Sequence, residues 1–162
     1  MKSFGRVHVE PARVGHGLFA SRAFGDAQRI VRLLGRIVSA ETVWNHQGRF
    51  ADNSYRFGPE TYLDPGDEAG AYVNHSCRPT AAIRKANNRL FLYAVTPIRK
   101  RSEITIDYST ILGDDDIWTM RCACGETNCR RLIRNFGSLP AELRAEYVEK
   151  QMVPKYVLMA RA

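Results

Sequence analysis

The sequence lacks any long apolar segment, any internal repeat and any low-complexity run. No stretch approaches the roughly 20 apolar residues of a membrane-spanning helix, and the N-terminal MKSFGRVHVE has no apolar signal-peptide core. These absences predict a soluble, unsecreted protein of the cytoplasm or, in a eukaryote, of the nucleus. No polar linker interrupts the 162 residues, of which 44% are hydrophobic, so one sizeable core is expected.

Cysteine is also scarce, with four in the whole chain. Disulfides are disfavoured in a reducing compartment, so a cysteine cluster there indicates a metal site or a reactive thiol. RCACGETNCRR contains three of the four, and the glycine at 125 lets the backbone turn so that the sulfurs of Cys122, Cys124 and Cys129 converge. A closed zinc site made only of thiolates needs a fourth.

The segment YVNHSCRP offers two candidates for this fourth ligand. Cys77 would complete an all-sulfur site, which suits zinc. Zinc bound in this way would also attach the C-terminal part of the chain to the centre of the domain. His75 is the rival ligand, whereas the other histidines have no local partner. A nucleophilic pair of His75 and Cys77 is a third reading, although side chains two positions apart are expected to diverge.

The net charge is strongly positive, at +7. A basic surface favours acidic partners, such as nucleic acid or the proteins that travel with it. Basic residues cluster as RKR at 99–101 and CRR at 129–131, although such clusters are commonly only solvated surface. Charge alone therefore predicts proximity to nucleic acid without identifying a partner.

Short apolar runs and turn residues predict a mostly β fold with few helices. Strands are expected in FGRVHVE, GHGLFAS, RIVRLLGRIVS, NSYRF, TYL and EITIDY. TAAIRKANNRLFLYAV predicts a hairpin, because Asn87 and Asn88 tolerate the positive φ of a two-residue type I′ turn.

Helical signals are confined to two segments. Ser39 is expected to N-cap a short helix that reaches about Gln47. In SLPAELRAEYVEKQM, Leu139, Leu143 and Tyr147 recur every four residues, which predicts a C-terminal helix whose apolar stripe docks on the domain.

Four segments occur in an order that resembles the SET-domain protein lysine methyltransferases with a post-SET zinc motif. They are GHGLFAS, NHSC at 74–77, EITIDY ending in Tyr108, and the C-x-C-x4-C tail, and the resemblance runs from about residue 5 to 133. The chain looks like the small stand-alone SET proteins of bacteria. The resemblance implies small curved β-sheets around a knot-like crossing, with a SET domain at 1–115, a post-SET zinc segment at 116–134 and a helical extension at 135–162.

The resemblance implies methyl transfer from S-adenosylmethionine to a lysine of a histone or another basic, DNA-associated protein, with S-adenosylhomocysteine as product. In such a reaction the cofactor supplies the reactivity, and the protein supplies alignment and a dry channel. Free lysine has a pKa of about 10.4 and is protonated at neutral pH. An apolar channel beside a sulfonium would lower that pKa by desolvation and like charge.

Site residues follow from the same resemblance, position by position. Tyr108 would orient the amine next to the transferring methyl, Tyr55 would line the lysine channel, and Ile106 would shape that channel with Tyr108. The implied zinc ligands are Cys77, Cys122, Cys124 and Cys129. The implied cofactor-binding residues are His16, Gly17, Tyr55, Asn74, His75 and Leu132.

Two of these positions depart from the family pattern. Ile106 stands where the family has Phe or Tyr, and without a hydroxyl to hold water beside the amine it is expected to permit more than one methylation. Leu132 stands where an aromatic residue often covers the adenine, and an aliphatic cover stacks less strongly. The alternative function is a non-catalytic, zinc-stabilised basic module that binds nucleic acid or chromosomal proteins.

Overall fold

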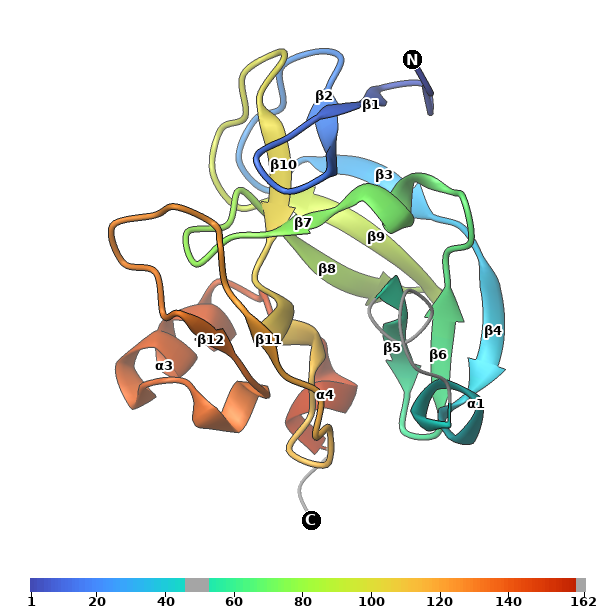
Figure 1. Ribbon diagram of the computed structural model, residues 1–162, viewed down its shortest axis with the longest axis vertical. Coiled ribbons are helices and arrows are strands. Elements are labelled where there is room, and N and C mark those ends of the chain that lie inside the picture. The colour runs from blue at the N-terminus through green and yellow to red at the C-terminus, as the bar shows by residue number, and fades with distance from the viewer. Residues whose placement is uncertain (46–52, 160–162) are drawn as a thin grey trace.

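The computed structural model describes residues 1–45 and 53–159. Small sheets make up most of the fold, as the strand patterns predict (Figure 1). The first sheet has the order β1-β2-β10-β7, formed by Val7–Pro11, His16–Ala20, Glu103–Ile106 and Asn74–His75. The second has the order β3-β9-β8, formed by Arg29–Leu33, Arg89–Ala94 and Ala81–Ala86. The third has the order β4-β6-β5, formed by Arg36–Ser39, Thr61–Asp64 and Tyr55–Gly58.

The remaining elements are short. A two-stranded ribbon pairs β11 (Met120–Arg121) with β12 (Leu132–Ile133). Within residues 1–45 and 53–159, the helices are α1 (Ala40–Trp44), α3 (Ala141–Glu149) and α4 (Lys155–Met159). The same residues contain three 3₁₀ turns, η1 (Ala69–Tyr72), η2 (Tyr108–Ile111) and η3 (Phe136–Ser138). Among the described residues, none of the helices is long and apolar enough to cross a bilayer.

The main core lies between the sheets and contains fully buried aliphatic residues such as Leu18, Ile30, Ile83 and Ile104. A second cluster lies under the C-terminal helices, where Phe136, Leu139, Tyr147, Met152, Val153 and Val157 pack with Ala82 of β8. The extension therefore covers the sheet β3-β9-β8 and shares its apolar surface.

The first sheet sets the position of the candidate site. Strand β10 pairs antiparallel with β2 and parallel with β7, where Thr105 lies opposite Asn74 and Ile106 opposite His75. Figure 1 shows β10 running down onto β7 near the middle of the molecule. Three distant segments, containing GHG, NHSC and EITIDY, thus become neighbours in one sheet.

Local turn chemistry is confirmed at the hairpin and at the first helix. Asn87 and Asn88, with φ of 48° and 55°, join β8 to β9 as expected. Ser39 caps α1 by accepting the N–H of Thr42 at 3.2 Å. The helix ends at Trp44, and the predicted end near Gln47 lies outside the described residues.

Two predicted boundaries are wrong. Strand β10 ends at Ile106 rather than at Tyr108, because the Asp107 side chain accepts the N–H of Ser109 and starts the η2 turn. The C-terminal segment contains two helices rather than one, and Leu139 precedes α3 because Pro140 occupies its N-cap. Leu139 is nevertheless buried in the second cluster with Tyr147, so the extension docks as predicted.

Candidate active site and metal centre

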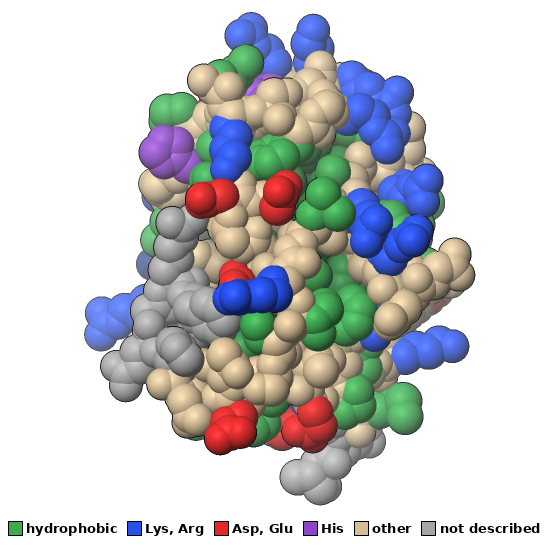
Figure 2. All heavy atoms as spheres, turned by 90° about the vertical axis from the view of Figure 1, so that its right-hand side faces the viewer, with side chains coloured by type: hydrophobic (Ala, Val, Ile, Leu, Met, Phe, Trp, Pro, Cys, Tyr) green, Lys and Arg blue, Asp and Glu red, His purple; other side chains and the backbone are tan. Residues whose placement is uncertain are grey.

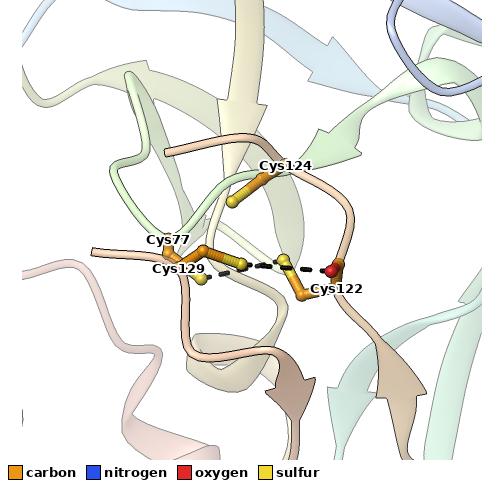
Figure 3. A group of neighbouring side chains, drawn as sticks. All are labelled: Cys77, Cys122, Cys124 and Cys129. Carbon is orange, nitrogen blue, oxygen red and sulfur yellow. Dashed lines mark hydrogen bonds between the residues drawn. The ribbon is translucent and has the colours of Figure 1, made fainter. Parts of the chain in front are cut away.

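The four cysteines meet at one point, although Cys77 lies far upstream of the others. Figure 3 shows their side chains converging from the segment after β7 and from the loop between β11 and β12. All four sulfur atoms lie within 4.8 Å of one another, and the Sγ atoms of Cys77 and Cys122 are 3.8 Å apart. Zn–S bonds of about 2.3 Å in a tetrahedron need sulfurs spaced in this way.

Backbone hydrogen bonds build the loop that carries three of these thiols, residues 121–131, called the knuckle below. The N–H of Cys122 donates to Arg131 O at 2.9 Å, and that of Cys129 donates to Glu126 O at 3.1 Å. Gly125 adopts φ of +78°, as its place in the tight turn predicts, and a Cβ there would collide with the guanidinium of Arg13. Arg13 Nε also donates to Ala123 O at 3.0 Å, which ties the knuckle to the loop before β2.

The donor set fits zinc. Burial raises the pKa of the Cys77 and Cys122 thiols, so a bound cation is what would keep these two groups as thiolates. The backbone N–H of Arg130 donates to Cys77 Sγ at 3.4 Å, which also favours the thiolate. Four soft sulfur ligands in a closed arrangement are typical of a structural zinc site.

His75 contacts Cys77, and the expectation that their side chains diverge is wrong. His75 Nε2 lies 3.3 Å from Cys77 Sγ, so the two side chains meet on one side of the chain. His75 Nδ1 accepts the backbone N–H of Tyr108 at 3.1 Å, which leaves the imidazole proton on Nε2, directed at the sulfur. Burial lowers the pKa of His75 to about 4, so the ring is neutral at neutral pH.

The two tyrosines implied by the resemblance lie beside one short segment. The Tyr108 hydroxyl donates to Val73 O at 2.8 Å, and the Tyr55 hydroxyl donates to Gly70 O at 2.5 Å. Burial and the neighbouring Tyr108 raise the pKa of Tyr55 well above its ordinary value. Both phenols are thus fixed by carbonyls of η1 and the residue that follows it.

A hollow of about 180 Å³ lies between the loop before β2, strand β7 and the knuckle. Its lining includes Arg13, Val14, Asn74, His75, Cys124 and Glu126. Asn74 Nδ2 donates to Glu103 Oε1 at 2.8 Å and contacts the carbonyls of Val14 and His16 at 3.2 Å. The hollow therefore combines two of the predicted cofactor residues with a wall from the knuckle.

The other predicted residues lie around this centre. His16 contributes its carbonyl to Asn74, and Gly17 is buried so tightly against Glu103 that a Cβ would collide with the carboxylate. Leu132 is 37% exposed on β12. Ile106 is fully buried in the main core, opposite His75 in register. Tyr55 and Leu132 do not line the hollow described above.

Sequence reasoning missed a group of residues around Asp107. This carboxylate binds Arg130 of the knuckle and Tyr147 of α3, and it adjoins Tyr108. One signal could have found it, because Asp107 directly follows the predicted strand EITI, and a carboxylate that is buried at the end of a strand must be paired. Its partners could not have been named from local pattern.

A second missed group holds the strand that carries Tyr55. Arg56, only 2% exposed, binds Asp116 at 3.0 Å through Nη1 and Asp115 at 2.7 Å through Nη2. The bond to Asp115 raises the pKa of Arg56 despite its burial. The loop after η2 is therefore anchored to β5. Trp118, farther along this loop, has its ring centroid 6.1 Å from that of Tyr108.

A family model for the SET domain matches residues 15–109, and the chain belongs to this family. The fold agrees, because the crystal structure of KRYPTONITE in complex with mCHH DNA, H3(1-15) peptide and SAH superposes with a TM-score of 0.61. That match has 19% sequence identity and covers 82% of this chain and 30% of the other.

Curated relatives are histone-lysine N-methyltransferases. An H3 lysine-4 specific enzyme of Mycosarcoma maydis is 26% identical over 129 residues, covering 72% of this chain and 9% of the relative. The histone-lysine N-methyltransferase set-2 of Caenorhabditis elegans is 29% identical over 128 residues, covering 72% of this chain and 8% of the relative. This chain thus corresponds to a small part of these longer proteins.

Proposed function

We propose that the protein is an S-adenosylmethionine-dependent protein-lysine N-methyltransferase with a structural zinc ion. The observation that carries this proposal is the junction of NHSC, Tyr108 and the four-cysteine cluster. His75 links Tyr108 to Cys77 through its two ring nitrogens, at 3.1 and 3.3 Å. Histone-lysine methyltransferase relatives support the same reaction.

The cofactor, when bound, supplies an electrophilic methyl group on a sulfonium. Asn74 and His75, which line the hollow, would hold it there. His16, Gly17 and Leu132, which the family resemblance adds, lie outside this lining. Glu103 holds the Asn74 amide at 2.8 Å, so this wall is set before binding. Preorganised contacts of this kind align the reacting atoms without a cost at the moment of transfer.

Tyr108 would orient the substrate amine. Its hydroxyl proton is directed to Val73 O, and since a phenol oxygen both donates and accepts, this oxygen would accept an N–H of the lysine. Tyr55, protonated because burial raises its pKa, would wall the channel without adding charge. An uncharged channel disfavours the ammonium form of the lysine and thereby exposes the lone pair that attacks the methyl group.

The substrate we propose is a histone or another basic, DNA-associated protein, as in the relatives named above. On the face drawn in Figure 2, Lys and Arg gather at the top and along the right-hand edge, whereas acidic side chains lie in the middle and at the bottom. Arg99, Lys100 and Arg101 are all exposed. In CRR, however, Arg130 binds Asp107, so one of the two arginines of this cluster stabilises the fold.

The test is transfer of label from tritiated S-adenosylmethionine to a panel of histones, other lysine-rich proteins and a bacterial lysate. Label on lysine, identified by mass spectrometry, is the expected result. Cofactor binding without label on any protein, together with salt-dependent DNA binding, would instead indicate the non-catalytic basic module.

We also propose that Ile106 permits more than one methylation of the same lysine. An aliphatic side chain offers no hydroxyl to hold a water beside the amine, so a methylated amine can turn and react again. Mass spectrometry is expected to find di- or trimethyl-lysine at long reaction times. Ile106→Tyr should shift the products toward monomethyl-lysine, whereas Ile106→Phe, with the ring but no hydroxyl, should not. Only monomethyl-lysine from the unaltered protein would contradict this.

A further inference from the structure

The carboxylate of Asp107 joins three parts of the chain. Its side chain is 0% exposed, and Oδ1 accepts the N–H of Ser109 at 3.0 Å and the guanidinium of Arg130 at 2.7 Å. Oδ2 accepts the hydroxyl of Tyr147 at 3.0 Å. These donors belong to η2, to the knuckle and to α3, respectively. A buried carboxylate is tolerated only where such donors replace water.

The two distant partners keep their protons. The Arg130 guanidinium has N–H donors and no acceptor, so its bond to Asp107 runs in one direction. Burial and the neighbouring Asp107 raise the pKa of Tyr147, so its hydroxyl remains a donor. The three-way contact therefore has one defined pattern of donors and acceptors.

Asp107 also fixes the turn that begins with Tyr108. Its side chain caps η2, and its carbonyl accepts the N–H and the hydroxyl of Thr110 at 2.9 and 2.7 Å. The Tyr108 N–H is bound to His75 Nδ1, which lies 3.7 Å from Asp107 Oδ1. A displacement of Asp107 would move the tyrosine and disturb its contact with the imidazole.

We propose that Asp107 is a positioning residue for methyl transfer, which holds Tyr108 in register only while the knuckle and α3 are both docked on its carboxylate. The inference rests on the proposed methyltransferase activity. Arg130 and Tyr147 lie beyond the residues 15–109 that the SET model matches. The C-terminal extension thus acts on the reaction through Asp107 without contacting the reacting atoms.

Tyr147→Phe tests this with the loss of a single hydroxyl. Because a hydrogen bond to a charged group is lost, kcat is expected to fall about tenfold while the KM for S-adenosylmethionine changes by less than about twofold. Hydrogen exchange of the Tyr108 and Ser109 amides should accelerate about tenfold. Amides of the β8-β9 hairpin should exchange as before, and zinc content should not change.

Tyr156→Phe is the matched control. Tyr156 lies in the same extension, and within the described ranges its buried hydroxyl has no hydrogen-bond partner. This variant should keep kcat and the exchange of the Tyr108 amide.

Two results separate the possible failures. A Tyr147→Phe protein that loses thermal stability but retains both kcat and Tyr108 exchange would make the contact merely structural and overturn the inference. If the unaltered protein methylates nothing, the proposed activity fails instead, and the exchange of the Tyr108 amide alone then decides whether Asp107 positions this residue.

Discussion

Tyr108→Phe is expected to lower methyl transfer about 10²- to 10³-fold, the range seen when one preorganised polar contact to a transition state is removed. The phenyl ring keeps its packing against His75, whose ring centroid is 5.3 Å away, so the cofactor site should stay intact. S-adenosylmethionine affinity, measured by calorimetry, should therefore change by less than about twofold. Rates measured at saturating S-adenosylmethionine do not depend on cofactor affinity, so a loss of rate there reports on the transfer step.

The control must lose a comparable hydrogen bond elsewhere. Tyr62→Phe removes a buried hydroxyl that donates to Asp116 at 2.5 Å, on the sheet β4-β6-β5. Each substitution leaves one acceptor without its donor and is expected to lower stability by about 1–3 kcal/mol. Equal losses of transfer in the two variants would mean that reduced stability, rather than orientation of the amine by Tyr108, explains the effect.

Short-range patterns were sufficient to predict most elements of the fold. The hairpin at Asn87 and Asn88 and the cap at Ser39 depend on residues within a few positions, so local chemistry decides them. The end of β10 was missed because Asp107 looks like a strand residue until its side chain bonds the turn that follows. The predicted end of a strand is wrong where a side chain competes with the strand for backbone N–H groups.

The candidate site likewise has one part that the sequence predicts and another that it does not. Cys77 was predicted because only one cysteine remained and the family resemblance placed it, and the structure brings its sulfur to the other three. The partners of Asp107 were not predictable, since Arg130 and Tyr147 lie 23 and 40 positions away and have no spacing rule. An arginine is usually a surface residue, and a tyrosine on an amphipathic helix usually packs against the core. The contact of Arg130 and Tyr147 with Asp107 is therefore visible only in the tertiary structure.

Cys77→Ser is expected to release zinc and to abolish S-adenosylmethionine binding together. Serine offers a neutral hydroxyl in place of a thiolate, and the loss of a direct ligand should exceed the 10- to 100-fold, or roughly 1.4–2.7 kcal/mol, seen for outer partners of metal ligands. The knuckle then loses its link to NHSC. Because Cys124 and Glu126 form one wall of the hollow that contains Asn74 and His75, that wall would no longer be held in place.

The measurements are zinc per chain by elemental analysis and cofactor affinity by calorimetry. Asn128→Ala is the matched control, since its amide donates to Cys77 O at 3.1 Å and offers zinc no sulfur. That variant should retain both zinc and cofactor affinity. Removal of zinc from the unaltered protein by a chelator should reproduce the Cys77→Ser result, because both treatments break the link between the knuckle and the NHSC segment.

His75 is a nearby group that could substitute for the lost thiolate, with Nε2 only 3.3 Å from the Cys77 sulfur. To bind zinc through Nε2 it would have to direct a lone pair there, which moves the proton to Nδ1 and breaks the bond from the Tyr108 N–H. Zinc retained in Cys77→Ser with transfer lost would therefore indicate this exchange of ligands. If Cys77→Ser retains both zinc and activity, the active site does not depend on this zinc ligand, and the proposed coupling of zinc to cofactor binding is refuted.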